Sequence, residues 1–270
     1  MENTFNKKES SKVPPLEGFR EAYILHLADD VLILGHRNSE WCGHGPVLEQ
    51  DIAFTNISLD LIGQARNFYQ YAALLIGNDC TEDKLAYLRD AQEFKNCLLV
   101  EQPKGDWAIT ILRQFFFSAY QFYLYQQLQE SNPDSYRDEQ LAAIAVKSLK
   151  EVTYHLRWSS EWVIRLGDGT DESHNSMVKA IDVLWTYTGE LFIPTEYEEQ
   201  AAAEGFGADI KSLKNKWQEK VNEIFTEATL PVPLNSNMHT GGKEGKHSDN
   251  LKEILTDLQF MQRTYPGSEW

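Results

Sequence analysis

The residues best suited to chemistry in this sequence are carboxylates and histidines at helical spacing. A helical bundle that binds two irons needs a carboxylate from each of two helices and a Glu-x-x-His pair from each of the other two. Carboxylate and imidazole ligands suit iron and manganese. The sequence holds one Glu-x-x-His pair, Glu244 with His247, and one Asp-x-x-His pair, Asp171 with His174. The first pair lies in a glycine-rich segment and the second at an expected helix start, so neither predicts a metal site inside a bundle.

Polar residues do occur where bundle helices would carry ligands, but the ligand set is incomplete. Asp60 is followed three residues later by Gly63, and Glu151 by Tyr154, with His155 one position further on. A lysine beside carboxylates supplies the positive charge that a metal would bring. The spacing therefore predicts a degenerate metal site that binds no metal and has no catalytic residue. Its predicted members are Asp30, Asp60, Ser118, Lys147, Glu151 and Tyr154. A working di-iron site with irregular ligands, or ordinary solvated helix faces, remain as alternatives.

A second candidate is a small basic, glycine-rich segment near the C-terminus. Gly241 and Gly242 precede Lys243, and Lys246 and His247 follow just before an expected helix N-terminus. Backbone amides at such a position favour anions. Lys243, Lys246 and His247 are therefore predicted as a contact for the phosphates of coenzyme A. The alternative is a turn without a ligand.

These side chains need long helices to position them, and the most pronounced helical pattern spans residues 46–77. Pro46 suits a first helical position, and the following residues are apolar on most sides, which is typical of a buried helix. Polar residues interrupt this pattern along one stripe, which we expect to be hydrogen-bonded inside the protein. The stripe consists of Glu49, Asn56, Asp60, Gly63 and Asn67.

Further helices are predicted over residues 16–37, 107–129 and 138–166, and shorter ones follow to the C-terminus. The long connection 78–107 permits a crossover, as in ferritin-like bundles. The predicted fold is all-α, a ferritin-like four-helix bundle with additional C-terminal helices. We expect a disordered leader over residues 1–15 and a single domain over 16–270, with the bundle at 16–167 and a helical extension at 168–270.

Composition narrows the class of protein further. The 270 residues carry a formal net charge of -16, which argues against nucleic-acid binding and against an anionic membrane surface. No apolar run is long enough to span a bilayer, and the polar N-terminus lacks a signal-peptide core, so we expect a cytoplasmic protein. The three cysteines form no CxxC pair.

Five blocks of the sequence resemble a known family, the C subunits of bacterial multicomponent phenylacetyl-CoA oxygenases (1,2-epoxidases). The blocks are EWCGHGPVLEQDIAFTNISLDLIGQARNFYQYAA, LLVEQPKGDWA, KEVTYHLRWSSEWVIRLGDGTDES, TGGKEGKHSDNL and the ending PGSEW. The resemblance implies a ferritin-like fold and a structural role beside a catalytic A subunit. In that system the A subunit holds the di-iron centre and epoxidises the aromatic ring of phenylacetyl-CoA, and a reductase supplies electrons from NADPH.

The predicted function is therefore that of a structural subunit in aerobic phenylacetate degradation, binding and stabilising the di-iron catalytic subunit. The chain itself is expected to bind no cofactor and to act within a hetero-oligomer, or as a homodimer, that meets phenylacetyl-CoA. Two alternatives stay open: a di-iron oxygenase subunit that is itself catalytic, and a module that binds coenzyme A.

Overall fold

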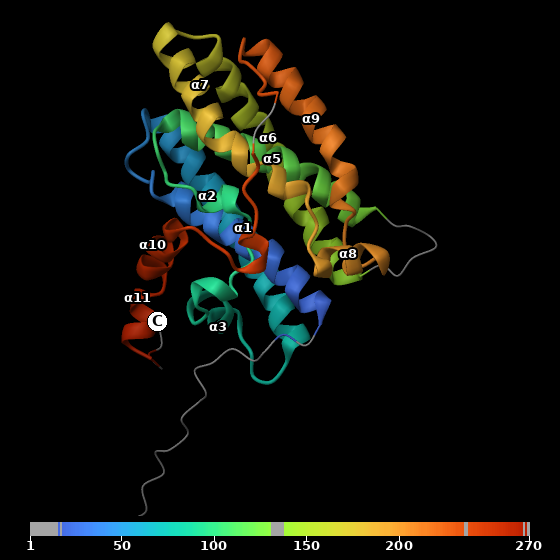
Figure 1. Cartoon of the computed structure of the whole chain (residues 1–270). Coiled ribbons are helices and arrows are strands. Elements are labelled where there is room, and N and C mark those ends of the chain that lie inside the picture. The colour runs from blue at the N-terminus through green and yellow to red at the C-terminus, as the bar shows by residue number, and fades with distance from the viewer. Residues whose placement is uncertain (1–15, 17, 131–137, 235–236, 267, 269–270) are drawn as a thin grey trace, which may run out of the picture.

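The protein is described by a computed structural model that covers residues 16, 18–130, 138–234, 237–266 and 268. The predicted leader at 1–15 lies outside the described residues. All regular elements of the described residues are helical, as the sequence predicts. Four long helices, α1 (Phe19–Ser39), α2 (Leu48–Ile76), α5 (Trp107–Gln129) and α6 (Glu139–Gly167), form the bundle in Figure 1.

The directions of the four helices identify the bundle as ferritin-like and confirm the predicted fold class. α2 and α6 run antiparallel, because Asp60 pairs with His155 and, one turn along, Gln64 pairs with Glu151. α2 and α5 run in the same direction, since Phe68 lies by Tyr125 at a centroid distance of 6.1 Å and Phe54 lies by Trp107 at 5.4 Å. A crossover therefore joins α2 to α5, and it contains the short helices α3 (Glu82–Tyr87) and α4 (Leu98–Glu101).

Local sequence fixes where these helices begin and end. Asp106 caps α5 by accepting a hydrogen bond from the Ile109 amide, and Asp138 caps α6 in the same way through Leu141. Gly77 ends α2 with a positive φ of 65°, a backbone conformation that glycine adopts without strain. α2 begins at Leu48, two residues after the expected Pro46. These caps satisfy helix-end groups that would otherwise lack intrahelical partners.

The C-terminal helices pack against the bundle. α7 (Asp171–Leu184) and α9 (Ile210–Glu227) lie along α5 and α6, whereas α8 (Glu196–Ala203) and α10 (Asp249–Leu258) contact α1 (Figure 1). The last helix, α11 (Phe260–Thr264), follows α10. The Trp217 indole on α9 donates a hydrogen bond to the Phe116 carbonyl oxygen at 2.9 Å. Burying one such large side chain contributes roughly 1.5–3 kcal/mol, so α9 is firmly attached to α5.

One expectation about α2 is wrong. The helix is not buried on all sides, because Leu48, Ile52, Leu59 and Leu74 are exposed on its outer face. The polar stripe also lies outward in part: Glu49, Asn56 and Gly63 are exposed, and only Asp60 and Asn67 are half-buried. α2 packs on α1 and contacts α3 and α6 along its edges, and no described segment covers its outer face. No helix in the described part of the chain is long and apolar enough to cross a membrane.

Candidate functional site

Polar side chains from three helices meet inside the bundle. The Gln64 amide on α2 donates a hydrogen bond to a Glu151 carboxylate oxygen on α6 at 2.8 Å. The Gln64 amide oxygen accepts hydrogen bonds from Gln121 at 3.0 Å and from the Tyr125 hydroxyl at 3.3 Å, both on α5. Burial raises the pKa of Tyr125, so its phenol stays protonated and available as a donor. These four residues form a hydrogen-bonded group, here called the bundle network, in which Glu151 is half-buried and the other three side chains are buried.

A second pair lies one turn away, at the boundary between α2 and α6. The His155 Nε2 atom is 3.0 Å from a carboxylate oxygen of Asp60. His155 is fully buried and its Nδ1 atom has no hydrogen-bond partner, while the Asp60 side chain is about one-third exposed. The pair links the bundle interior to the surface between the two helices.

Whether this region could hold a metal ion depends on which of its side chains are free to act as ligands. Asp60, Glu151 and His155 are the ionisable candidates, and each is already bonded to a neighbouring side chain. α5 contributes amide and hydroxyl groups at Gln121 and Ser118, where a di-iron bundle uses a carboxylate. Within the described ranges, no three His, Cys, Asp or Glu side chains are grouped so that they would hold a metal ion. The arrangement suits a hydrogen-bond network better than a di-iron centre.

The structure separates the other predicted members of the degenerate site. The Ser118 hydroxyl accepts a hydrogen bond from Gln114, and Gln114 in turn accepts one from Asn38 on α1, at 2.8 and 2.6 Å. Lys147 and Tyr154 lie on the outer surface of α6, where the Arg157 guanidinium sits over the Tyr154 ring at 5.8 Å. Asp60 and Glu151 are thus near one another, and Ser118, Lys147 and Tyr154 are elsewhere.

Asp30 belongs to a different buried cluster, between α1, α8 and the segment before α4. Its carboxylate accepts a hydrogen bond from the Cys97 amide at 2.7 Å, and burial raises its pKa although His26 opposes the shift. His26 Nδ1 is 2.8 Å from the Lys95 carbonyl oxygen, so that nitrogen carries a proton. Its Nε2 atom lies 3.6 Å from Asp30 and 3.5 Å from Glu198.

Lys243, predicted to contact coenzyme A, is buried in the same cluster. Its ammonium lies 3.0 Å from both carboxylate oxygens of Glu198 and donates a further hydrogen bond to the Ile193 carbonyl at 3.1 Å. Burial raises the pKa of Glu198, but Lys243, His26 and a backbone hydrogen bond together lower it by more, and the net shift is downward. The lysine charge is therefore used inside the protein.

The rest of the predicted phosphate loop is also held from inside. Glu190 accepts hydrogen bonds from the Gly241 and Gly242 amides at 2.7 and 2.8 Å. His247 contacts a Glu101 carboxylate oxygen at 2.8 Å and the Phe94 carbonyl at 2.9 Å. Burial lowers the pKa of His247, but the hydrogen bond and charge of Glu101 together raise it by more, so the net shift is upward. Of the three predicted contacts, only Lys246 points to solvent.

Sequence reasoning did not find one further buried ion pair. Arg89 and Asp29 form a two-pronged salt bridge, one prong of which is 3.0 Å, and the Tyr69 hydroxyl also donates to Asp29 at 2.5 Å. An aspartate in the middle of a helix is a poor helix former, and this is the signal in the sequence that could have indicated a buried partner for Asp29. Its partner, however, comes from a segment 60 residues away, and no local pattern links the two.

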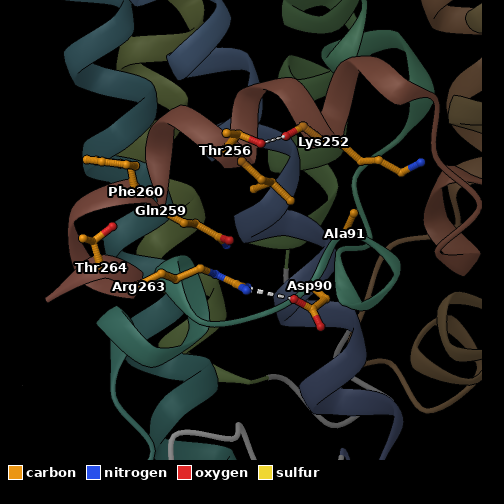
Figure 2. A pocket seen from close by; sticks show the side chains of 9 residues that line it. Asp90, Ala91, Lys252, Thr256, Gln259, Phe260, Arg263 and Thr264 are labelled. Carbon is orange, nitrogen blue, oxygen red and sulfur yellow. Dashed lines mark hydrogen bonds and ion pairs between the residues drawn. The ribbon is translucent and has the colours of Figure 1, made fainter. Parts of the chain in front are cut away.

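An open pocket of about 330 Å³ lies between α10, α11 and residues Asp90 and Ala91. Figure 2 shows the Arg263 guanidinium directed at Asp90, and the two groups are 3.0 Å apart. Gln259 donates hydrogen bonds to the carbonyl oxygens of Ala86 and Arg89. Arg263 and Gln259 are thus already bonded to neighbouring groups of the protein, so neither points to a ligand in this pocket.

Comparison with known proteins identifies similar sequences. A family model described as phenylacetic acid catabolic protein matches residues 17–270. The chain is also similar to the C subunit of the 1,2-phenylacetyl-CoA epoxidase of Escherichia coli strain K12. The two are 48% identical over 249 residues, which cover 92% of this chain and 98% of the relative.

Proposed function

Since the chain belongs to the phenylacetic acid catabolic protein family, we propose that it is the structural subunit of a phenylacetyl-CoA epoxidase complex. In this role it binds and stabilises a second chain that holds the di-iron centre and epoxidises the aromatic ring. The similar protein from E. coli is named as the C subunit of such an epoxidase, which supports membership of a multi-subunit enzyme.

The observation that carries the structural role is that the ionisable groups of the bundle network and of the neighbouring Asp60–His155 pair are bonded to other side chains. In a di-iron bundle the carboxylates and imidazoles direct their lone pairs at the metals. Here the Glu151 carboxylate accepts from the Gln64 amide, and the His155 Nε2 atom is turned to Asp60. Hydrogen bonds between side chains inside a bundle help to specify how its helices pack. The network therefore favours a scaffold over a redox centre.

Co-expression with a tagged candidate catalytic subunit tests this proposal. We expect the two chains to purify together, and turnover of phenylacetyl-CoA with reductase and NADPH to require both. The chain purified alone is expected to contain iron well below stoichiometric amounts. Stoichiometric iron in the lone chain, together with turnover of the substrate without a second chain, would contradict the proposal and favour a catalytic role. Failure of the two chains to associate would also overturn it.

A further inference from the structure

An unusually apolar stripe follows the outer face of α2. Leu48, Ile52, Leu59 and Leu74 are exposed by 71%, 53%, 61% and 75%. Their spacings of four, seven and fifteen residues are close to whole numbers of helical turns, so the four side chains share one face. At 1.5 Å per residue the stripe is about 39 Å long. The exposed Arg66 and Gln70 lie on the same face between Leu59 and Leu74, so the apolar side chains are densest from Leu48 to Leu59. Single exposed leucines are common, but a cluster on one helical face marks an interaction surface.

α6 adds a basic row beside this stripe. Lys147, Lys150 and Arg157 are exposed along one side of α6, with the partly exposed Tyr154 between them. The two helices are neighbours because Asp60 contacts His155 and Gln64 contacts Glu151. These exposed cations stand out in a chain whose net charge is -16. Acidic groups lie nearby, since Glu161 is 4.0 Å from Arg157 and the partly exposed Asp60 and Glu151 lie at the boundary with α2.

Half-buried aromatic rings lie at one end of the same surface. Trp158 on α6 stacks on Phe54 of α2 at a centroid distance of 5.7 Å, and Trp162 lies 6.1 Å from Trp158. Both tryptophans are partly exposed. Tryptophan and tyrosine are among the side chains most enriched at the energetic centres of protein interfaces.

We propose that this surface, here called the α2–α6 face, is where the chain docks its catalytic partner subunit. The inference rests on the proposed function and names the surface through which it acts. The partner is expected to present an apolar helix over α2, flanked by carboxylates opposite Lys147, Lys150 and Arg157. Gly63, near the middle of α2, has nothing within 4 Å of the position of an added Cβ atom, so a partner helix can approach closely there.

The size of the α2–α6 face matches such an interface. Each helix has 29 residues and is about 43 Å long. With helices about 10 Å wide, two adjacent helices present roughly 860 Å², and a stable interface buries about 800 Å² per partner. Charge opposes a second copy that docks with α6 against α6. A two-fold dimer that placed α6 against α6 would bring three cations from each chain together, and like charges across an interface oppose association.

The test compares Leu59→Asp, in the middle of the face, with Val183→Asp, an equally apolar exposed position on α7 outside it. Both side chains are exposed, so both variants should keep the circular dichroism spectrum and melting temperature of the wild type. We expect Leu59→Asp to raise the Kd for the catalytic subunit at least about tenfold, because a carboxylate must lose its water in the interface. We expect Val183→Asp to leave the Kd unchanged. Reversing Lys147, Lys150 and Arg157 to glutamate should slow association, most strongly at low salt.

The outcomes separate this inference from the proposed function. If the wild type binds the catalytic subunit and Leu59→Asp binds equally well, the α2–α6 face is not the docking surface and the proposed function stands. If the wild type does not bind the catalytic subunit, the proposed function itself fails. If Leu59→Asp instead disrupts a homodimer in sedimentation experiments while binding of the catalytic subunit is unchanged, a second copy covers the face and the inference is overturned.

Discussion

Replacing Lys243 by methionine removes the positive member of a buried ion pair while keeping most of the side-chain volume. The ammonium makes three hydrogen bonds, two to Glu198 and one to the Ile193 carbonyl oxygen. Removing one partner of a buried pair destabilises a protein by about 3–5 kcal/mol, because the other charge stays buried without compensation. Glu198 keeps its hydrogen bonds from Thr195. We therefore expect Lys243→Met to lower the free energy of unfolding by about 3 kcal/mol, the lower end of this range.

Lys246→Met is the matched control, because Lys246 is three residues away in the same loop and is exposed. Urea denaturation followed by circular dichroism should show the loss for Lys243→Met and a change within about 0.5 kcal/mol for Lys246→Met. At about 2–3 °C per kcal/mol, the melting temperature of Lys243→Met should fall by roughly 6–9 °C. Equal stability of the two variants would refute the buried-pair reasoning. If the two variants were equally stable and Lys243→Met raised the KM of the assembled enzyme for the coenzyme A ester, Lys243 would instead be a contact for the phosphates of coenzyme A.

Three further variants test other parts of the fold. Gly63→Ala should raise the free energy of unfolding by about 0.5–1 kcal/mol in urea titration, because the position is helical and open to solvent. Gly167→Ala should lower the melting temperature by an amount equivalent to about 1–3 kcal/mol, since an added Cβ atom would lie 2.5 Å from the Ala228 carbonyl oxygen. Because the pKa of His247 is raised in the folded protein, its protonated form stabilises the fold. This stabilisation is complete below pH 6.5, the ordinary histidine pKa, and is lost as the pH rises through the pKa of the folded protein. Urea midpoints at about pH 6 and 8 should therefore differ less in His247→Gln than in the wild type, and an unchanged difference would contradict the role given to Glu101.

Much of the fold was predictable from the sequence because helix periodicity is a local property. The expected helices over 107–129 and 138–166 agree closely with α5 and α6, whose aspartate caps are visible in the sequence. The long crossover between α2 and α5 was predicted from its length alone. Both features depend on neighbouring residues and require no knowledge of distant contacts.

The buried charge clusters were not predictable, because their members come together from distant segments. Lys243 meets Glu198 across 45 residues, and Asp29 meets Arg89 across 60. Glycines around Lys243 suggested a ligand loop, but the amides of that loop bond to Glu190 instead. A short motif therefore cannot separate an anion site for a ligand from one that is filled by a carboxylate of the same chain.

For α2, the burial predicted from the sequence pattern differs from the burial observed in the single chain. Its apolar residues on most sides predicted a buried helix, yet its outer face is uncovered: Leu61 is fully buried, while Leu59, two residues away, is 61% exposed. Hydrophobic periodicity indicates that a side chain is buried, but it does not indicate whether the same chain or a partner chain covers it. A chain of an obligate complex has two apolar cores, one within itself and one shared with its partner, and obligate interfaces resemble a domain core cut in half. The proposed assembly would explain the exposed apolar side chains of α2, just as packing within the bundle explains its buried side chains such as Leu61.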